Sequence, residues 1–188
     1  MTNFREKIMH TDISSKRYFE DSSVDFSTLN SRSFAVKRSG TGKKILEIGT
    51  SSGGVTRFLK EFGNEIVGIE IDEEAAKIAE KYCSRMIIGD VEKIDFSDIF
   101  KDEKFDVIIL TDVLEHLIWP ESLLLKIRLL LSTEGYLIIS IPNFFHHDVF
   151  LNLFRGDFRY TSKGLLDITH LRFFGLRNIC KLFFQTGY

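Results

Sequence analysis

Residues 43–54 read "KKILEIGTSSGG", and this stretch decides the fold. Residues 45–48 form a short apolar run that contains one acid, Glu47, and the run breaks into a loop of small residues. A strand that ends in such a loop is typical of a ligand-binding turn at the start of a βα unit. Phosphate is the usual ligand of these turns, but Glu47 beside it would repel an anion. The turn therefore favours an uncharged or cationic ligand.

Outward from this turn, strands and helices alternate along the chain. Apolar runs predict strands at residues 44–49, 65–71, 85–90, 105–112 and 135–142. Apolar residues at helical spacing predict helices near residues 29–37, 55–62, 75–82, 123–131 and 176–183. This order predicts an α/β, Rossmann-like, doubly wound fold, with a mostly parallel sheet and helices on both faces. In such sheets, ligands bind beyond the carboxyl ends of the strands.

Four successive strand ends each deliver a carboxylate to that edge of the predicted sheet. They are Glu47, Glu70, Asp90 and Asp112. One such acid alone is weak evidence, because acids often cap the following helix. Together they describe a pocket that prefers cationic or hydroxyl-rich groups.

A nicotinamide dinucleotide is one alternative ligand. Gly49-x-Ser51-x-x-Gly54 is a degraded dinucleotide fingerprint, and Glu70 follows at the spacing of a ribose-binding acid. The middle glycine is missing, however, and Glu47 would lie close to the pyrophosphate at a Coulomb cost of about 1–4 kcal/mol. A cofactor without phosphate and with a net positive charge removes this conflict.

The stretch "ILEIGTSSGGVTRFLKEFGNEIVGIEID" resembles the cofactor-binding half of class I S-adenosylmethionine-dependent methyltransferases, of the small-molecule type. The first loop of that family reads [D/E]-x-G-x-G-x-G, which Glu47, Gly49 and Gly53 match, while Ser51 replaces the middle glycine. "IIGDVEKIDF", "FDVIILTDVLEHL" and "LLSTEGYLIISIPN" resemble the third, fourth and fifth strand ends of the family, so the resemblance covers residues 43–143.

The resemblance implies S-adenosylmethionine as cofactor and methyl transfer to a small-molecule acceptor as the activity. Glu47 would receive the ammonium and Glu70 the ribose hydroxyls, while Asp112 would lie near the methionine part. The remaining contacts would come from backbone at the first loop and from the adenine pocket: Gly49, Thr50, Ser51 and Gly53, then Ile71, Asp90 and Val91. A non-catalytic S-adenosylmethionine-binding module is a further alternative, because Ser51 departs from the family pattern.

Histidines are the candidates for a general base near neutral pH. His116 follows the fourth strand, His146 and His147 follow the fifth, and His170 lies in "DITHLRFF". The pattern D-x-T-H-x-R-F-F resembles one in a subset of the family linked to sugar and glycan chemistry. Asp167 would orient His170, and Arg172 would hold an anionic acceptor. Metal binding by His146, His147 and His170 is not supported by their spacing, so no metal is expected.

The distribution of charged and aromatic residues also bears on the chemistry of the methyl acceptor. Residues 61–115 hold 16 acids and 6 Lys or Arg, whereas residues 116–188 hold 5 acids and 8 Lys or Arg. The second segment therefore favours an anionic or sugar-linked acceptor, although solvated surfaces explain the same pattern. "FFHHDVFLNLFRGDF", at residues 144–158, is dense in aromatics, which predicts buried core or a lid.

Composition predicts one cytoplasmic domain of 188 residues: an arm and helix at 1–42, a cofactor-binding core at 43–143, and a substrate-side insert with the last helix at 144–188. A net charge of −2 and the lack of a long apolar run predict neither a nucleic-acid nor a membrane partner. Cys83 and Cys180 are expected to be core thiols. The chain stops where the resembled fold continues into strands six and seven, so we expect both to be missing and the chain to be a fragment. The oligomeric state stays open.

Overall fold

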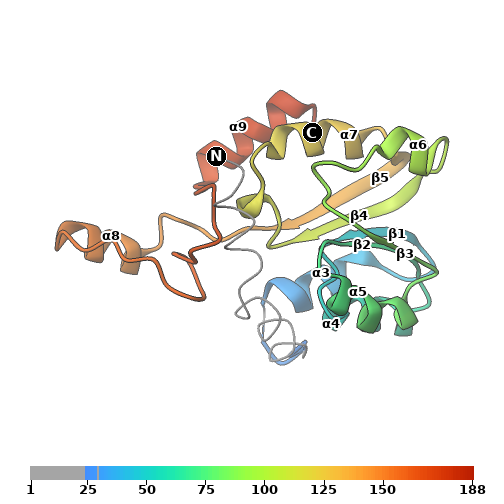
Figure 1. Ribbon diagram of the computed structural model, residues 1–188, viewed down its shortest axis with the longest axis horizontal. Helices are drawn as coiled ribbons and strands as arrows, with labels where there is room; N and C mark the ends of the chain where they lie inside the picture. Colours follow the sequence, from blue (N-terminus) through green and yellow to red (C-terminus); the bar gives the residue numbers. More distant parts are fainter. Residues whose placement is uncertain (1–23, 29) are drawn as a thin grey trace.

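The computed structural model describes residues 24–28 and 30–188. The described residues form a five-stranded sheet of order β3-β2-β1-β4-β5, in which every neighbouring pair is parallel. The strands are β1 (Lys44–Ile48), β2 (Glu65–Glu70), β3 (Arg85–Ile88), β4 (Phe105–Thr111) and β5 (Leu131–Ser140). The chain order reverses between β1 and β4, as in a doubly wound sheet (Figure 1). The predicted fold class is confirmed.

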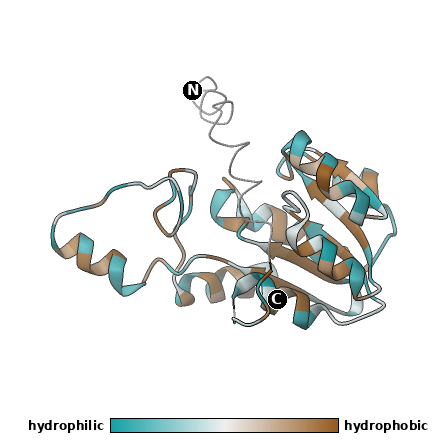
Figure 2. Ribbon diagram, turned by 90° about the horizontal axis from the view of Figure 1, so that it is seen from below, coloured by the Kyte–Doolittle hydropathy of each residue, from teal (hydrophilic) through white to brown (hydrophobic). Residues whose placement is uncertain are grey.

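Helices cover both faces of the sheet, as predicted (Figures 1 and 2). One face packs on α3 (Ser31–Ser39) and α4 (Gly54–Glu61), through side chains such as Val36 and Leu59, with α5 (Glu73–Ala79) alongside. The other face packs on α6 (Phe96–Phe100), α7 (Pro120–Arg128) and α9 (Leu176–Thr186). Successive residues of β4 alternate between these two cores, which explains why the strand is apolar on both sides.

Some predicted boundaries were wrong. The helix expected over residues 123–131 ends at Arg128, because the N–H groups of Leu129 and Leu130 close its last turn on Lys126 and Ile127. Leu131 already pairs with Phe105 and begins β5, although the ladder is irregular until Tyr136 pairs with Val107. The stripe at 75–82 is α5 followed by a short 3-10 helix, η1 (Glu80–Tyr82).

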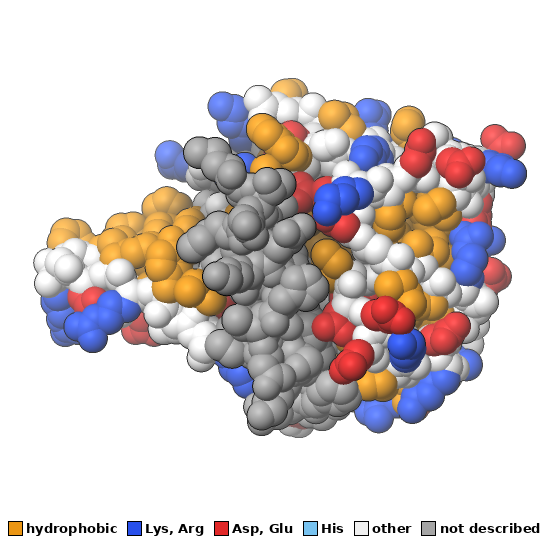
Figure 3. Space-filling view, in the orientation of Figure 1, with side chains coloured by type: hydrophobic (Ala, Val, Ile, Leu, Met, Phe, Trp, Pro, Cys, Tyr) orange, Lys and Arg blue, Asp and Glu red, His pale blue; other side chains and the backbone are white. Residues whose placement is uncertain are grey.

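The aromatic segment after β5 differs most from the expectation. It forms α8 (His147–Phe154), which projects away from the sheet and carries exposed apolar side chains such as Phe154, at 85% exposure (Figures 1 and 3). Val149 is the buried residue of this helix. The prediction of a core segment was therefore wrong, since local aromatic density does not reveal whether a partner surface lies opposite.

The two cysteines differ in burial. Cys83 is half-buried, and burial raises the pKa of its thiol to about 12. Cys180 is exposed on the outer side of α9, so the prediction of a core thiol was wrong there. No helix in the described part of the chain is long and apolar enough to cross a bilayer. Most of the predicted arm lies outside the described residues.

Candidate active site

The turn after β1 is held by the carboxylate at the end of β2. Ser51 has φ +49°, a left-handed conformation, and its N–H donates to Glu70 Oε2 at 2.7 Å. Glu70 Oε1 accepts from the N–H groups of Ile71 and Asp72, at 2.8 and 3.0 Å. Burial raises the pKa of Glu70 although these three donors oppose the shift. Glu70 thus fixes the shape of both the first and the second loop.

Two glycines give the turn its close packing. Gly49 and Gly53 have φ of +78° and +85°, where residues with a Cβ are disfavoured. A Cβ on Gly49 would lie 2.7 Å from Val113 Cγ2, and one on Gly53 would lie 2.9 Å from Tyr82 Cδ2 and 3.1 Å from Ala79 Cα. The loop after β1 therefore packs directly on the loop after β4.

Glu47 lies at the base of this turn and is 1% exposed. Its Oε2 has no hydrogen-bond partner among the described residues. Burial raises the pKa of Glu47 to about 8, the Thr56 hydroxyl works against the shift, and the charge of Glu70 adds to it. A buried carboxylate oxygen without a partner is costly unless a cation or a donor approaches it.

The acid after β3 caps its own turn. Asp90 Oδ1 accepts from the Glu92 N–H at 3.0 Å, and Oδ2 lies 3.1 Å from Lys93 Nζ. Glu92 in turn reaches across to the segment after β4, where its Oε1 accepts from the N–H groups of Ile118 and Trp119 at 2.9 and 2.8 Å. This carboxylate joins two loops of the same sheet edge, and the sequence pattern gave no indication of it.

The end of β4 is fixed to β5. Asp112 has φ +56°, its N–H donates to the Ser140 carbonyl at 3.0 Å, and its Oδ1 accepts from Ser140 Oγ at 2.8 Å. The Asp112 side chain is exposed at the sheet edge. Three of the four predicted acids, Glu70, Asp90 and Asp112, thus serve loop structure, and whether they also bind a ligand stays a prediction.

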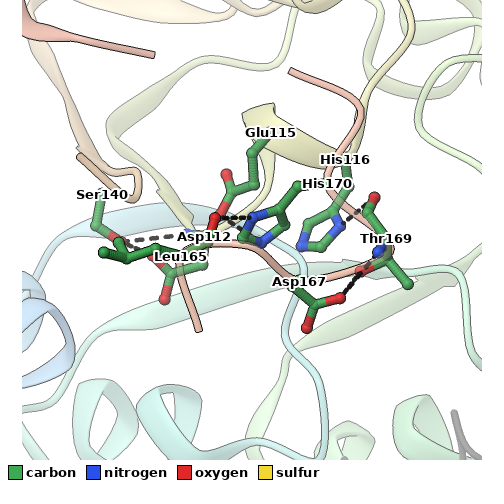
Figure 4. A network of polar contacts seen from close by, with 8 residues as sticks. All are labelled: Asp112, Glu115, His116, Ser140, Leu165, Asp167, Thr169 and His170. Atoms are coloured by element: carbon green, nitrogen blue, oxygen red, sulfur yellow. Dashed lines mark hydrogen bonds and ion pairs between the residues drawn. The ribbon is translucent and has the colours of Figure 1, made fainter. Parts of the chain in front are cut away.

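Beyond Asp112, three ionisable side chains meet (Figure 4). Glu115 and His116 lie on a short 3-10 helix, η2 (Leu114–His116), and His170 comes from the segment before α9. The rings of His116 and His170 lie 4.9 Å apart, and His170 Nε2 lies 4.0 Å from Glu115 Oε1. One ligand atom from each of the three residues lies within 4.8 Å of the others. The structure therefore joins two predicted histidines with a glutamate that was not predicted as a site residue.

Burial controls the charge of this cluster. It raises the pKa of Glu115 to about 8, and the nearby charges of Asp112 and Asp167 raise it further. It lowers the pKa of His116, while the hydrogen bond to the Thr169 carbonyl works against the shift. His116 is therefore a neutral imidazole near neutral pH, as a general base or a metal ligand must be.

Asp167 and Arg172 both contact other parts of the chain. The Asp167 carboxylate accepts from the N–H and hydroxyl of Thr169 at 2.8 and 2.7 Å, and His170 Nδ1 lies 3.2 Å from the Leu165 carbonyl. The guanidinium of Arg172 donates to the Ile118 carbonyl and lines a groove between α7 and α9, of about 290 Å³, together with Glu121. Whether Asp167, His170 and Arg172 bind an acceptor stays a prediction.

His146 and His147 form a separate pair at the start of α8. Their rings lie 4.2 Å apart, and both approach the Asp148 carboxylate, at 3.3 and 3.1 Å. His146 is the N-cap of the helix and His147 is exposed. Because α8 projects away from the sheet, the structure separates these two histidines from the cluster after β4 (Figure 1).

Comparison with known proteins agrees with this geometry. Residues 27–188 match the methyltransferase domain family. An uncharacterised protein of Methanocaldococcus jannaschii is 34% identical over 137 residues, which are 73% of this chain and 62% of that protein. A ubiquinone biosynthesis O-methyltransferase of Glaesserella parasuis is 31% identical over 109 residues, 54% of this chain and 46% of that protein. The chain thus spans about half to three fifths of the length of these relatives.

Solved structures share the fold. A methyltransferase of Thermotoga maritima, described as a possible histamine N-methyltransferase, superposes with a TM-score of 0.66 at 24% identity and covers 93% of this chain and 75% of its own. A methyltransferase of Archaeoglobus fulgidus gives a TM-score of 0.63 at 19% identity and covers 86% and 71%. The chain belongs to the methyltransferase domain family and has the class I S-adenosylmethionine-dependent fold, whose cofactor is S-adenosylmethionine.

The residues present fit this cofactor. Glu47 offers a buried carboxylate oxygen without a partner, which suits an ammonium group. Gly49 and Gly53 let the turn pack closely on Val113 and on Tyr82, which fixes the shape of the backbone beside Glu47. Glu70 keeps about one free lone pair out of roughly four, because three backbone donors use the others.

Proposed function

We propose that the protein transfers a methyl group from S-adenosylmethionine to a small-molecule acceptor bound above the loops after β1 and β4. The observation that carries the proposal is Glu47, a fully buried acid with an unpartnered oxygen at the base of a glycine turn. Its pKa of about 8 leaves this acid protonated near neutral pH in the free protein, and an approaching ammonium favours the ionised form, directly or through water, whereas a phosphate opposes it. When bound, the cofactor supplies an electrophilic methyl group on a sulfonium.

Residues from different loops at the sheet edge would each bind a different part of the cofactor. Glu47, Thr50 and the backbone from Gly49 to Gly53 would hold the methionine part, with Asp112 on its far side. Glu70 would accept one hydrogen bond from the ribose with its free lone pair, rather than the two that the sequence predicts. Ile71, which is 45% exposed, would pack on the adenine, and Asp90 with the Val91 backbone would bind its edge.

The acceptor would lie at the His116 side of the sheet edge. Methyl transfer needs alignment of the nucleophile with the methyl carbon and exclusion of water, and the loop packing of Val113 against Gly49 brings the two sides together. An anionic or sugar-linked acceptor rests on the charge of residues 116–188, because the Arg172 side chain points to the α7–α9 groove. Cytoplasmic location and the lack of a nucleic-acid partner stay predictions from composition.

Calorimetry with S-adenosylhomocysteine tests the proposal. Glu70→Ala should weaken binding by about 1–3 kcal/mol, because it removes a ribose acceptor and releases the Ser51 N–H. Glu65→Ala, at the opposite end of the same strand, is the matched control and should leave affinity unchanged. Absence of heat with folded wild-type protein at millimolar ligand contradicts the proposal.

Two alternatives are separated by further measurements. A nicotinamide-dependent oxidoreductase rests on Gly49, Ser51, Gly54 and Glu70, and the family assignment favours methyl transfer over it. Fluorescence titration with NADH distinguishes the two. A non-catalytic S-adenosylmethionine-binding module would bind the cofactor without turning over any acceptor in a library, and a single methylated product eliminates it.

A further inference from the structure

The cluster after β4 presents three hydrogen-bond acceptors to one another. A carbonyl oxygen only accepts, so a neutral histidine that contacts one must carry its hydrogen on the contacting nitrogen. His116 Nδ1 lies 3.1 Å from the Thr169 carbonyl, and His170 Nδ1 lies 3.2 Å from the Leu165 carbonyl. Both Nε2 atoms therefore carry a lone pair, and the His116 ring turns toward His170 (Figure 4).

Glu115 supplies the third acceptor. The residue is 1% exposed, and neither Oε1 nor Oε2 has a hydrogen-bond partner among the described residues. The nearest basic nitrogen is His170 Nε2 at 4.0 Å, which is beyond hydrogen-bond distance. A cation that binds here would displace the proton of Glu115, and the carboxylate and the two imidazole lone pairs would then be satisfied together by that one cation.

The backbone fixes this arrangement before any cation arrives. The Glu115 carbonyl accepts from the N–H groups of Leu171 and Arg172, at 2.7 and 3.0 Å, so η2 is tied to the segment that carries His170. The two histidine Nδ1 contacts to carbonyls are the outer-shell bonds that orient metal-binding imidazoles. His170 N–H also donates to the Asp167 carbonyl at 3.0 Å, which closes the turn that presents the ring.

We infer that Glu115, His116 and His170 form a binding site for a divalent first-row transition-metal ion. Two imidazoles and one carboxylate suit Zn²⁺, Fe²⁺ or Co²⁺ rather than Mg²⁺ or Ca²⁺, which prefer oxygen ligands. Three protein ligands leave one or more coordination positions for water or an oxygen atom of another molecule. His116 is partly exposed and gives the ion a path from solvent, whereas Glu115 and His170 are buried.

A metal ion at this site excludes the predicted role of His116 as a general base. A metal ion would occupy the Nε2 lone pair of His116, which a general base needs for the proton of the acceptor. The inference does not depend on methyl transfer, because metal binding can be measured without cofactor or acceptor. A buried ion pair between protonated His170 and Glu115 is the competing explanation of the cluster.

Metal titration of the full chain tests the inference. Wild-type protein should bind one Zn²⁺ tightly in calorimetry, and Co²⁺ should give visible absorption bands of a low-symmetry site. Glu115→Gln and His170→Ala should each weaken Zn²⁺ binding at least roughly tenfold. The matched control is His146→Ala with His147→Ala, which removes the exposed histidine pair next to Asp148 and should leave that affinity unchanged.

Three outcomes would overturn the inference. These are no Zn²⁺ binding at millimolar metal, loss of binding in the His146 and His147 variant alone, and wild-type affinity in folded Glu115→Gln. If either cluster variant fails to fold by circular dichroism, histidine NMR of wild-type protein decides instead. Co²⁺ should then shift or broaden the ring signals of His116 and His170, and unchanged signals point to the ion pair. Calorimetry with S-adenosylhomocysteine reports separately on the proposed methyl transfer site.

Discussion

Ser51 is the residue at which the glycine turn departs from the family pattern, and the structure shows how the turn accepts it. Its left-handed φ of +49° costs about 1–2 kcal/mol for a residue with a Cβ. The short hydrogen bond from its N–H to buried Glu70 holds it there. Gly53, two residues on, has no such freedom, because both its conformation and its surroundings require glycine.

Gly53→Ala should lower the free energy of unfolding by about 2–4 kcal/mol and prevent binding of S-adenosylhomocysteine, because the new Cβ meets the backbone of Ala79 as well as Tyr82. Gly63→Ala is the control: its φ is +77°, but nothing lies within 4 Å of the added Cβ. Urea unfolding of both variants separates conformational strain from steric conflict. Equal losses in the two variants would show that the close packing at Gly53 contributes nothing.

For single residues, the sequence predicted which acids reach the sheet edge but not which groups they contact. Glu47 and Glu70 lie where the strand pattern puts them, since a parallel strand must deliver its last residues to that edge. Glu115 was overlooked because nothing in "DVLEHL" reveals that His170, more than fifty residues later, will lie against it. An acid directly before a histidine after a central strand is the signal that could have pointed to the cluster.

Among the elements, α3 depends most clearly on its end. It is polar on average, yet Asn30 closes a capping box with Ser33: the Ser33 N–H donates to Asn30 Oδ1 at 2.8 Å, and the Asn30 N–H donates to Ser33 Oγ at 3.2 Å. The helix then buries Ala35 and Val36 on the sheet. Loss of the cap should therefore weaken the packing of α3 on the sheet face formed by β1 and β4.

Asn30→Ala should reduce the free energy of unfolding by about 1 kcal/mol, within a range of roughly 0.5–2. Asn30→Asp keeps the accepting oxygen and should retain most of the stability. Thermal and urea unfolding of the three proteins measure the effect. A loss in Asn30→Asp as large as in Asn30→Ala would mean that the Nδ2 contacts to Asp25 and Thr28, rather than the cap, stabilise the helix.

Elements with a strong period were predictable, and those set by tertiary contacts were not. The five strands and the helices that contain Leu59, Ile127 and Ile179 follow from apolar spacing alone. The start of β5 did not, because Leu131 fits the end of a helical stripe as well as the first pair of a strand. The aromatic residues of α8 carry no local sign that they would stay exposed.

For the whole molecule, buried carboxylates determine the response to pH. Burial raises the pKa of Glu47 and Glu115 to about 8 and also raises that of Glu70. The folded state therefore holds protons that the unfolded chain releases above about pH 4.5. Stability falls as pH rises toward the folded pKa values, with a limit near 1.4 kcal/mol per pH unit for each acid.

The free energy of unfolding should therefore decrease between pH 6.5 and 8, above the range in which His116 has an opposing effect. Glu47→Gln cannot ionise and should show a shallower decrease. Urea denaturation of both proteins at several pH values in that range measures the slopes. An unchanged slope in the variant would mean that Glu47 ionises normally in the folded protein.

The bond network around Glu92 also places a natural optical probe at the site. Trp119 is the single tryptophan of the chain, and its backbone N–H donates to the Glu92 carboxylate, which spans the loops after β3 and β4. The residue is 61% exposed, so the emission of its indole responds to solvent and to nearby ligands. Ligand binding that changes the loops after β3 and β4 can thus be followed in real time, without a label, through the emission of one side chain.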